Sequence, residues 1–166
     1  LKNQLLDVIV SFIIASLNTR RTLSKCLEGI STQDYPHSSM EVLILDGGST
    51  DKSLDIANQF SHQLAIKIIH AGFKENQEAR RMVGFQKAKY ELVCILDTDN
   101  YIGSSNWLSC LVEPMEKHPE LVGSFTLHYH YEPTQTSFNR YVALFGGHDP
   151  ISYYLGKTDR LKWTDK

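Results

Sequence analysis

The sequence predicts a single α/β domain over residues 1–166, with a mainly parallel central sheet flanked by helices. Short apolar runs alternate along the chain with segments whose apolar residues recur at helical spacing, the pattern of strands joined by crossover helices. The first run, 8–17, is rich in Val and Ile without polar alternation, as in a strand covered on both faces. No internal repeat, linker or low-complexity segment divides the chain.

The first half of the chain alternates strand and helix in a regular order. After the strand 8–17, apolar residues recur at i, i+3, i+4 and i+7 over 23–30, which is the stripe of an amphipathic helix. The apolar run 40–45 is expected to be a second strand. The loop 46–51 is rich in residues that tolerate unusual backbone angles, and it leads into a short helix that ends near Phe60.

The second half continues the alternation. Residues 65–69 are expected to be a third strand, and 92–96 a fourth. Between them the spacing predicts a helix over 75–88, whose shared face carries Ala79, Met82, Val83 and Gln86. The chain then continues with a helical stripe, an alternating half-exposed strand and a last helical stripe, over 108–115, 125–131 and 138–145 respectively.

Composition and charge exclude several classes of protein. The net charge is −2 and no run of Lys or Arg forms a basic patch, so a nucleic-acid backbone is not an expected partner. Cys26, Cys94 and Cys110 are odd in number, lack C-x-x-C spacing and lie in apolar patterns, which indicates reduced core thiols in a cytoplasmic protein. The longest apolar stretch, 8–17, has about ten residues, well short of the roughly twenty needed to cross a bilayer.

The fourth strand ends at two carboxylates, Asp97 and Asp99. In an extended segment alternate side chains share a face, so these two are expected to point the same way while Thr98 points elsewhere. Burying an ionised carboxylate without a partner is costly, so the pair favours a cation. Two hard oxygens suit Mg²⁺ or Mn²⁺ and leave the other positions to water or phosphate, whereas the alternative interpretation is a solvated turn.

Polar residues also close the first two strands, since Ser16 and Asn18 follow the first and Asp46 the second. Ligands of open parallel sheets bind outside the carboxyl ends of the strands, so these groups and the carboxylate pair are expected at one rim. Asp46 could accept a hydrogen bond from a ring N–H, as uracil offers, or brace the glycine turn after it. Arg80 and Arg81 are expected at the surface, where one could bridge to a diphosphate.

Four segments together resemble, in order and spacing, the inverting glycosyltransferases of family 2, which have a Rossmann-like GT-A fold. The segments are Val-Ser-Phe-Ile-Ile-Ala-Ser-Leu-Asn at 10–18, Glu-Val-Leu-Ile-Leu-Asp-Gly-Gly-Ser-Thr-Asp at 41–51, Ala-Arg-Arg at 79–81 and Leu-Asp-Thr-Asp at 96–99. The resemblance covers about 8–100, the donor-binding half of such a domain, and leaves 101–166 as part of an acceptor region.

The resemblance implies binding of a nucleotide-diphosphate sugar, such as a UDP-sugar, and transfer of the sugar with inversion to a glycan or lipid-linked acceptor. Such enzymes serve polysaccharide biosynthesis, many of them at the inner face of the membrane. It also implies that Asp97 and Asp99 hold Mg²⁺ or Mn²⁺ and that Asp46 holds the ring N–H of the base. The implied nucleotide-sugar-binding residues are Ala15, Ser16, Leu17, Asn18, Asp46, Gly48, Ser49, Arg80, Asp97 and Thr98.

The sequence departs from the family at two points. Gly47 stands where a second acidic residue is common. Family members also carry a further segment with the Asp or Glu that deprotonates the acceptor, so we expect a fragment, truncated at its C-terminus, that binds donor without turning it over. Asp149, in the glycine-rich stretch 146–150, falls early for this base, and an acceptor-loop or structural role is preferred.

Two other functions fit parts of the same pattern. A catalytically inactive nucleotide-sugar-binding module would share the donor site and lack the base. A nucleotidyltransferase of similar fold would need a glycine-rich loop with a basic residue after the first strand, and 18–21 contain no glycine. The P-loop and G-x-G-x-x-G motifs of other nucleotide-binding folds are absent from the sequence.

Overall fold

The structure, a computed structural model, describes residues 8–126 and 131–145. Its strands are β1 (Val10–Ser16), β2 (Met40–Asp46), β3 (Ala65–His70) and β4 (Leu92–Ile95). Its helices are α1 (Leu23–Ser31), α2 (Ser53–Gln59), α3 (Gln77–Lys87), α4 (Trp107–Lys117) and α5 (Ser137–Phe145), with a 3₁₀ turn η1 (His37–Ser39). The predicted strands and helices up to residue 117 and the last helix are therefore confirmed, with ends shifted by a few residues.

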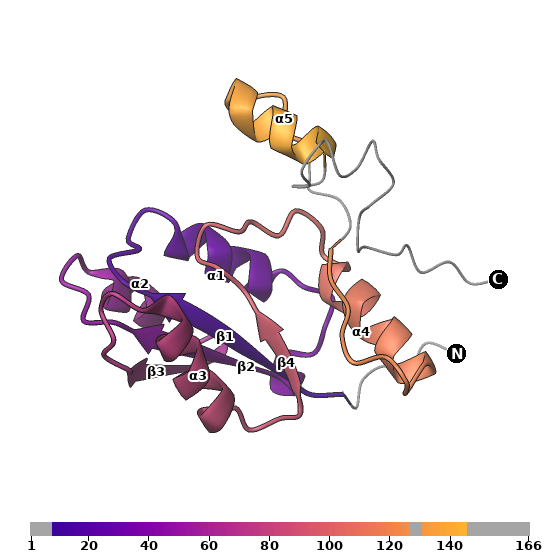
Figure 1. The fold of residues 1–166 in the computed structure, drawn as a ribbon, viewed down its shortest axis with the longest axis horizontal. Coiled ribbons are helices and arrows are strands. Elements are labelled where there is room, and N and C mark those ends of the chain that lie inside the picture. Colours follow the sequence, from indigo (N-terminus) through magenta and orange to yellow (C-terminus); the bar gives the residue numbers. More distant parts are fainter. Residues whose placement is uncertain (1–7, 127–130, 146–166) are drawn as a thin grey trace.

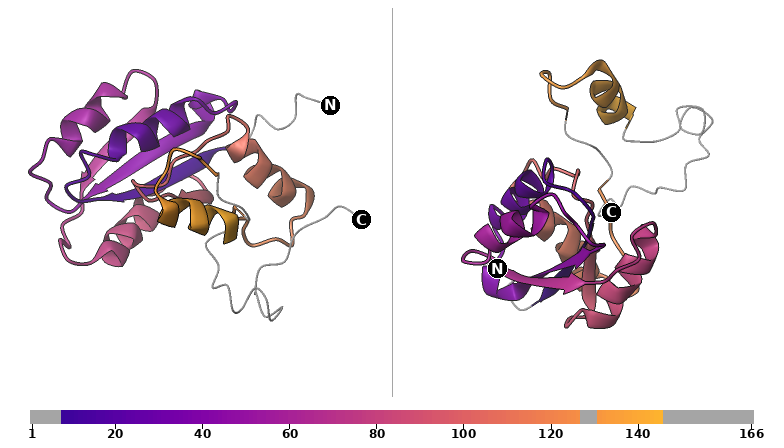
Figure 2. Two further views of the ribbon diagram at one scale, coloured as in Figure 1. Left: turned by 90° about the horizontal axis from the view of Figure 1, so that it is seen from above. Right: turned by 90° about the vertical axis from the view of Figure 1, so that its left-hand side faces the viewer.

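The strands of the described part form one parallel sheet in the order β3-β2-β1-β4. Helices α1 and α2 cover one face of this sheet and α3 covers the other, as Figures 1 and 2 show. The chain first steps outward from β1 to β3, then returns through α3 to place β4 on the other side of β1. The strand order therefore reverses between β1 and β4, where open parallel sheets bind their ligands.

Strand β1 lies at the centre of the core, and all of its residues are buried. Its side chains alternate between the two faces of the sheet, as the pleat requires. Phe12 and Ile14 belong to the larger apolar cluster, which α1 and α4 complete. Ile13 belongs to a second cluster with Leu43 and Leu45, on the face that α3 covers. This cover on both faces explains why the sequence of β1 is apolar without alternation.

Helix α3 packs on the sheet through only part of the predicted face. Arg80 and Gly84 are its buried residues, whereas Met82 is 56% exposed and Gln86 is exposed. Gly84 allows this approach, because a Cβ atom there would lie 2.6 Å from Cγ2 of Ile13. The predicted face was right at Val83, which packs on the Ile13 cluster, and wrong at Met82 and Gln86, because the closest contact is made where a side chain is missing, at Gly84.

A buried amide joins α1 to the segment that precedes α4. Gln33 is 6% exposed, and its Nε2 donates to the carbonyl oxygens of Gly29 and Ser104, each at 2.9 Å. Its Oε1 accepts from the backbone N–H of Leu108, also at 2.9 Å. The three hydrogen bonds satisfy the buried amide of Gln33, and they hold the segment between β4 and α4 against α1.

Two other predictions need correction. Cys26 is buried, but Cys110 is exposed, because it lies on the face of α4 opposite the buried Leu108 and Val112. Over 125–131, the described residues form no strand, since none of them pairs with the sheet; 127–130 lie outside the described residues. Alternation predicts a half-buried strand only where a neighbouring strand is available.

None of the helices within 8–126 and 131–145 combines the length and apolarity that crossing a membrane requires.

The contact between α3 and β1 can be tested by Gly84→Ala. The new methyl group would lie 2.6 Å from Cγ2 of Ile13 and 3.2 Å from Cδ2 of Leu45, and both of these side chains are buried. We expect the free energy of unfolding, measured in urea, to fall by about 1–3 kcal/mol. The control is Gly123→Ala, where a Cβ atom meets nothing within 4 Å, and its effect should stay within about 0.5 kcal/mol. Equal effects of the two changes would contradict the proposed packing.

Candidate functional site

A cleft opens at the carboxyl ends of the strands, where the strand order reverses. We call it the rim cleft, and it is lined by Ala15, Leu17, Asn18, Thr19, Arg20, Arg21, Thr22, Asp51, Gln77, Arg80, Asp97, Thr98 and Asp99. The register explains this meeting, because β4 ends opposite Ile13 while β1 continues to Ser16. The residues after β4 therefore lie beside the last residues of β1. Predicted site residues from three segments, 15–18, Arg80 and 97–99, line the cleft together.

One wall of the cleft is made by two loops that bond to each other. The backbone N–H of Asn18 donates to Oγ of Ser49 at 3.0 Å, and Oδ1 of Asn18 accepts from the N–H of Thr50 at 2.9 Å. The N–H of Arg20 donates to Oδ2 of Asp51 at 3.0 Å. Asn18 has a φ of 53°, the left-handed region that Asn tolerates better than most residues. The two loops thus hold one conformation through side-chain to backbone bonds.

Asp46 supports this wall from behind and does not line the cleft. It is 2% exposed, and its carboxylate accepts from the N–H of Gly48 at 3.1 Å and of Ser49 at 3.0 Å. Nδ1 of His70 lies 3.4 Å from the same carboxylate. Burial alone would raise the pKa of Asp46, but the hydrogen bonds from Ser49, Gly48 and His70 outweigh it and lower the pKa below 3.8. The structure therefore shows Asp46 bracing the glycine turn, one of the two roles considered from the sequence.

Three further predicted residues also lie outside the lining: Ser16, Gly48 and Ser49. Ser16 is fully buried, and its hydroxyl bonds to that of Thr19 at 2.7 Å. Gly48 has a φ of 99°, which glycine adopts without strain, and it forms the turn that Asp46 braces. These residues shape the cleft wall rather than face its interior.

Arg80 is buried, contrary to the expected surface position. It is 5% exposed, and its Nη1 donates to the carbonyl oxygens of Phe73 and Lys74 at 2.8 and 3.0 Å. The guanidinium packs on Gly47, where a Cβ atom would lie 3.0 Å from Nη1. Its Nε has no hydrogen-bond partner among the described residues. Arg80 thus holds the β3–α3 loop and brings a positive charge to the cleft.

The two carboxylates of the predicted metal site lie in a turn, not in an extended strand. The N–H of Asn100 donates to the carbonyl oxygen of Asp97 at 3.0 Å, which closes the turn after β4 has ended. Thr98 is 9% exposed, while Asp99 is exposed and makes no hydrogen bond or ion pair with any residue that the structure describes. Both carboxylates still line the rim cleft, as predicted, but through turn geometry rather than strand alternation.

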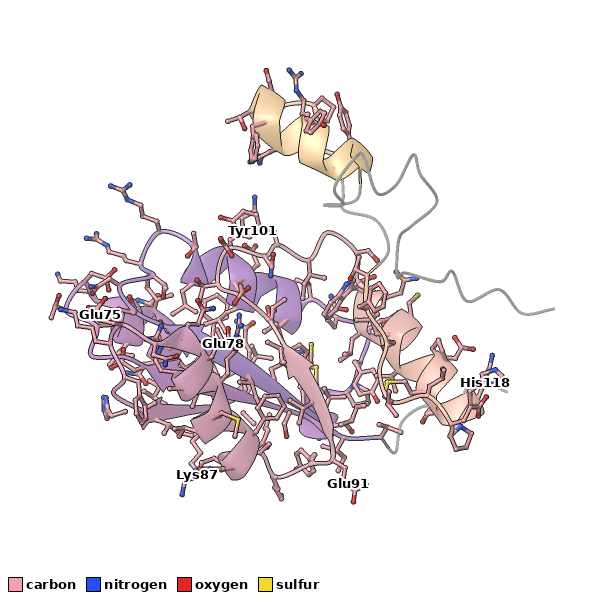
Figure 3. All side chains as sticks on the ribbon, viewed as in Figure 1. Glu75, Glu78, Lys87, Glu91, Tyr101 and His118 are labelled. Atoms are coloured by element: carbon pink, nitrogen blue, oxygen red, sulfur yellow. The ribbon has the colours of Figure 1, made fainter. Side chains whose placement is uncertain are left out.

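Asp97 already has two partners. Nε2 of Gln77 donates to its Oδ1 at 2.8 Å, and Nη2 of Arg81 makes a short ion pair with the same atom. Gln77 was not named as a site residue from the sequence, and Arg81 was considered only with Arg80, as one of two arginines that could bridge to a diphosphate. A helix that connects two parallel strands begins at the carboxyl ends of the strands. The first turns of α3 must therefore lie at the same edge of the sheet as the rim cleft. Figure 3 shows this direction, with Glu78 at the rim end of α3 and Lys87 at the other.

The oxygen atoms of Asp97 and Asp99 suit a divalent cation whose other ligands are water or phosphate. Within the described part of the chain, no group of three or more His, Cys, Asp or Glu side chains surrounds one point. Asp99 offers an unengaged carboxylate at the cleft, and Asp97 offers its remaining lone pairs. Mg²⁺ and Mn²⁺ accept such hard oxygens and keep several positions for water or phosphate.

The chain is similar to known glycosyltransferases. Residues 11–164 match the model of the family described as Glycosyl transferase family 2. The glycosyltransferase GlyG of Streptococcus pneumoniae is 27% identical over 137 residues, which cover 81% of this chain and 44% of GlyG.

Solved structures have the same fold. The crystal structure of TarS 1-349 from Staphylococcus aureus in complex with UDP superposes with a TM-score of 0.61 at 25% identity, over 68% of this chain and 33% of that one. The mannosyltransferase PcManGT of Pyrobaculum calidifontis, in complex with GDP-Man and Mn²⁺, gives a TM-score of 0.57 at 24% identity, over 64% and 32%. The fold is therefore that of GT-A glycosyltransferases, and the chain spans less than half the length of each of these relatives.

The brace at Asp46 can be tested by Asp46→Asn. We expect the free energy of unfolding at neutral pH to fall by about 1–3 kcal/mol, since an amide cannot accept from both turn N–H groups as the carboxylate does. The pKa of Asp46 is lowered in the fold, so its stabilisation is complete above the ordinary value of 3.8 and is lost as the pH falls through the folded value. Urea unfolding of wild type and variant should converge at low pH. A difference that stays constant would contradict the brace.

Proposed function

The chain belongs to glycosyltransferase family 2, and we propose that it is the donor-binding part of an enzyme that transfers a sugar from a UDP-sugar to an acceptor hydroxyl. The observation that carries this proposal is the rim cleft, where the loop after β1 and the turn after β4 meet at the reversal of strand order. The cleft combines carboxylates with a buried arginine, which suits a ligand that carries a diphosphate and a cation.

The base and ribose lie against the loop 15–18 in this proposal. Asp46 acts on the base side of the cleft indirectly, because it lies behind the wall and holds the turn at Gly48 and Ser49 through its carboxylate. The fixed contact of Asn18 with Ser49 and Thr50 keeps the wall in place before the ligand arrives. The UDP bound to TarS, which is 25% identical to this chain, supports the choice of uridine.

The diphosphate lies between Arg80 and the turn that contains Asp97 and Asp99. Asp99 holds Mg²⁺ or Mn²⁺ at its unengaged carboxylate, and Asp97, fixed by Gln77, faces the ribose. A bound divalent cation supplies a Lewis acid that stabilises the negative charge of the leaving diphosphate. The Mn²⁺ in the PcManGT complex is consistent with this assignment.

The acceptor approaches from a second hollow that shares Asp99 with the rim cleft. Its lining includes the aromatic residues Tyr101, Trp107 and Phe125, which suit the apolar faces of a sugar. Attack from this side, opposite the leaving diphosphate, inverts the anomeric carbon. The base that deprotonates a glycan or lipid-linked acceptor stays unassigned, because Asp149 lies outside the described residues.

Calorimetry with UDP tests the donor site. Wild type is expected to bind UDP more tightly with Mn²⁺ than with EDTA, and Asp99→Asn is expected to lose about tenfold in affinity with Mn²⁺ and nothing with EDTA. Asp55→Asn is the matched control, since it removes an exposed carboxylate from α2, whose residues do not line the cleft. Absence of UDP binding would contradict the donor site, and UDP binding that Mn²⁺ does not change would contradict the metal.

A further inference from the structure

Arg81 sits behind the turn that carries the two carboxylates. Its guanidinium bonds to Asp97 through Nη2 and to Glu78 through Nη1, the latter at 2.5 Å. The side chain is 18% exposed, and Nε has no hydrogen-bond partner among the described residues. Asp97 lines the rim cleft and Arg81 does not. The arginine therefore touches Asp97 from outside the cleft.

The two carboxylates of the turn are consequently unequal. Asp97 is 40% exposed and carries a guanidinium on one oxygen. Asp99 is exposed and has no ion pair within the described ranges. A divalent cation approaching the turn meets one carboxylate that has no cationic partner, Asp99, and one, Asp97, whose charge is partly offset by a guanidinium that it shares with Glu78. Two unpaired carboxylates would attract the cation by themselves, whereas one carboxylate holds it weakly until other oxygens join.

We propose that Arg81 is a positioning residue that sets how the site takes its cation. Fixed on Asp97, it offsets that carboxylate, so the ion is held by Asp99 and binds tightly only together with the diphosphate. The diphosphate part rests on the proposed function, while the unequal carboxylates do not. Arg81 also keeps Asp97 in one orientation toward the cleft, which leaves its second oxygen for the ribose. The site therefore stays nearly free of cation until donor arrives.

Mn²⁺ binding without nucleotide, measured by electron paramagnetic resonance, tests the proposal directly. Removing the positive charge in Arg81→Gln is expected to tighten Mn²⁺ binding about tenfold, because Asp97 then adds its full charge. The neutral pair Arg81→Gln with Asp97→Asn has the same net charge as wild type and should return to within about threefold of it. Arg81→Lys keeps the charge and should resemble wild type. Glu78→Gln, the matched control, touches Arg81 but not Asp97 and should change Mn²⁺ affinity less than twofold.

Two results would overturn the proposal. Unchanged or weaker Mn²⁺ binding in a folded Arg81→Gln protein would show that Arg81 does not offset Asp97. Much weaker binding in the neutral double variant would show that Asp97 itself is a ligand of the ion, and this result stands even where Arg81→Gln alone does not fold. Circular dichroism and the melting temperature establish folding. The measurement contains no UDP, so a failure of the donor site and a failure of this proposal are distinguished.

Discussion

The close packing of α3 on β1 is the contact on which the arrangement of this chain depends. Because α3 crosses the face of the sheet opposite α1 and α2, it carries the chain from β3 back past β1, and β4 pairs on the far side. That pairing puts the turn after β4 beside the loop after β1. Gly84 permits the helix to approach this closely, and the same helix delivers Arg80, Arg81 and Gln77 to the rim. Fold and site therefore share one helix.

Much of the fold followed from the sequence because burial leaves a strong pattern. The unbroken apolar run of β1 and the spacing of α1 predicted elements that the structure confirms. Asp97 and Asp99 were identified because charged residues directly after an apolar strand are unusual. The closest contact of α3 and the burial of Arg80 were not predictable, since they depend on a missing side chain at Gly84 and on the carbonyl groups of the loop that precedes α3. The spacing of apolar residues indicates which residues are buried, but it does not indicate which other segment of the chain covers them.

The cleft wall is organised before any ligand binds. Polar side chains of the two loops accept hydrogen bonds from each other's backbone N–H groups, which holds the loops together. Asp46 adds a brace beneath the turn, and Gln33 fixes the chain that follows the carboxylates. A site built in this way loses little conformational entropy on binding, and this favours affinity for a flexible ligand. The pairing of Arg81 with Asp97 belongs to the same organisation.

The contact between Gly47 and Arg80 links two positions that lie far apart in the sequence. A side chain at residue 47 would press against the Arg80 guanidinium, because its Cβ atom would lie 3.0 Å from Nη1. A related chain with an acidic residue there needs the guanidinium to shift by a few tenths of an ångström, which alters its hydrogen bonds to the carbonyl groups of Phe73 and Lys74. The residue types at positions 47 and 80 are therefore expected to covary during evolution, whereas those at 73 and 74 contribute only backbone carbonyl groups and are free to vary.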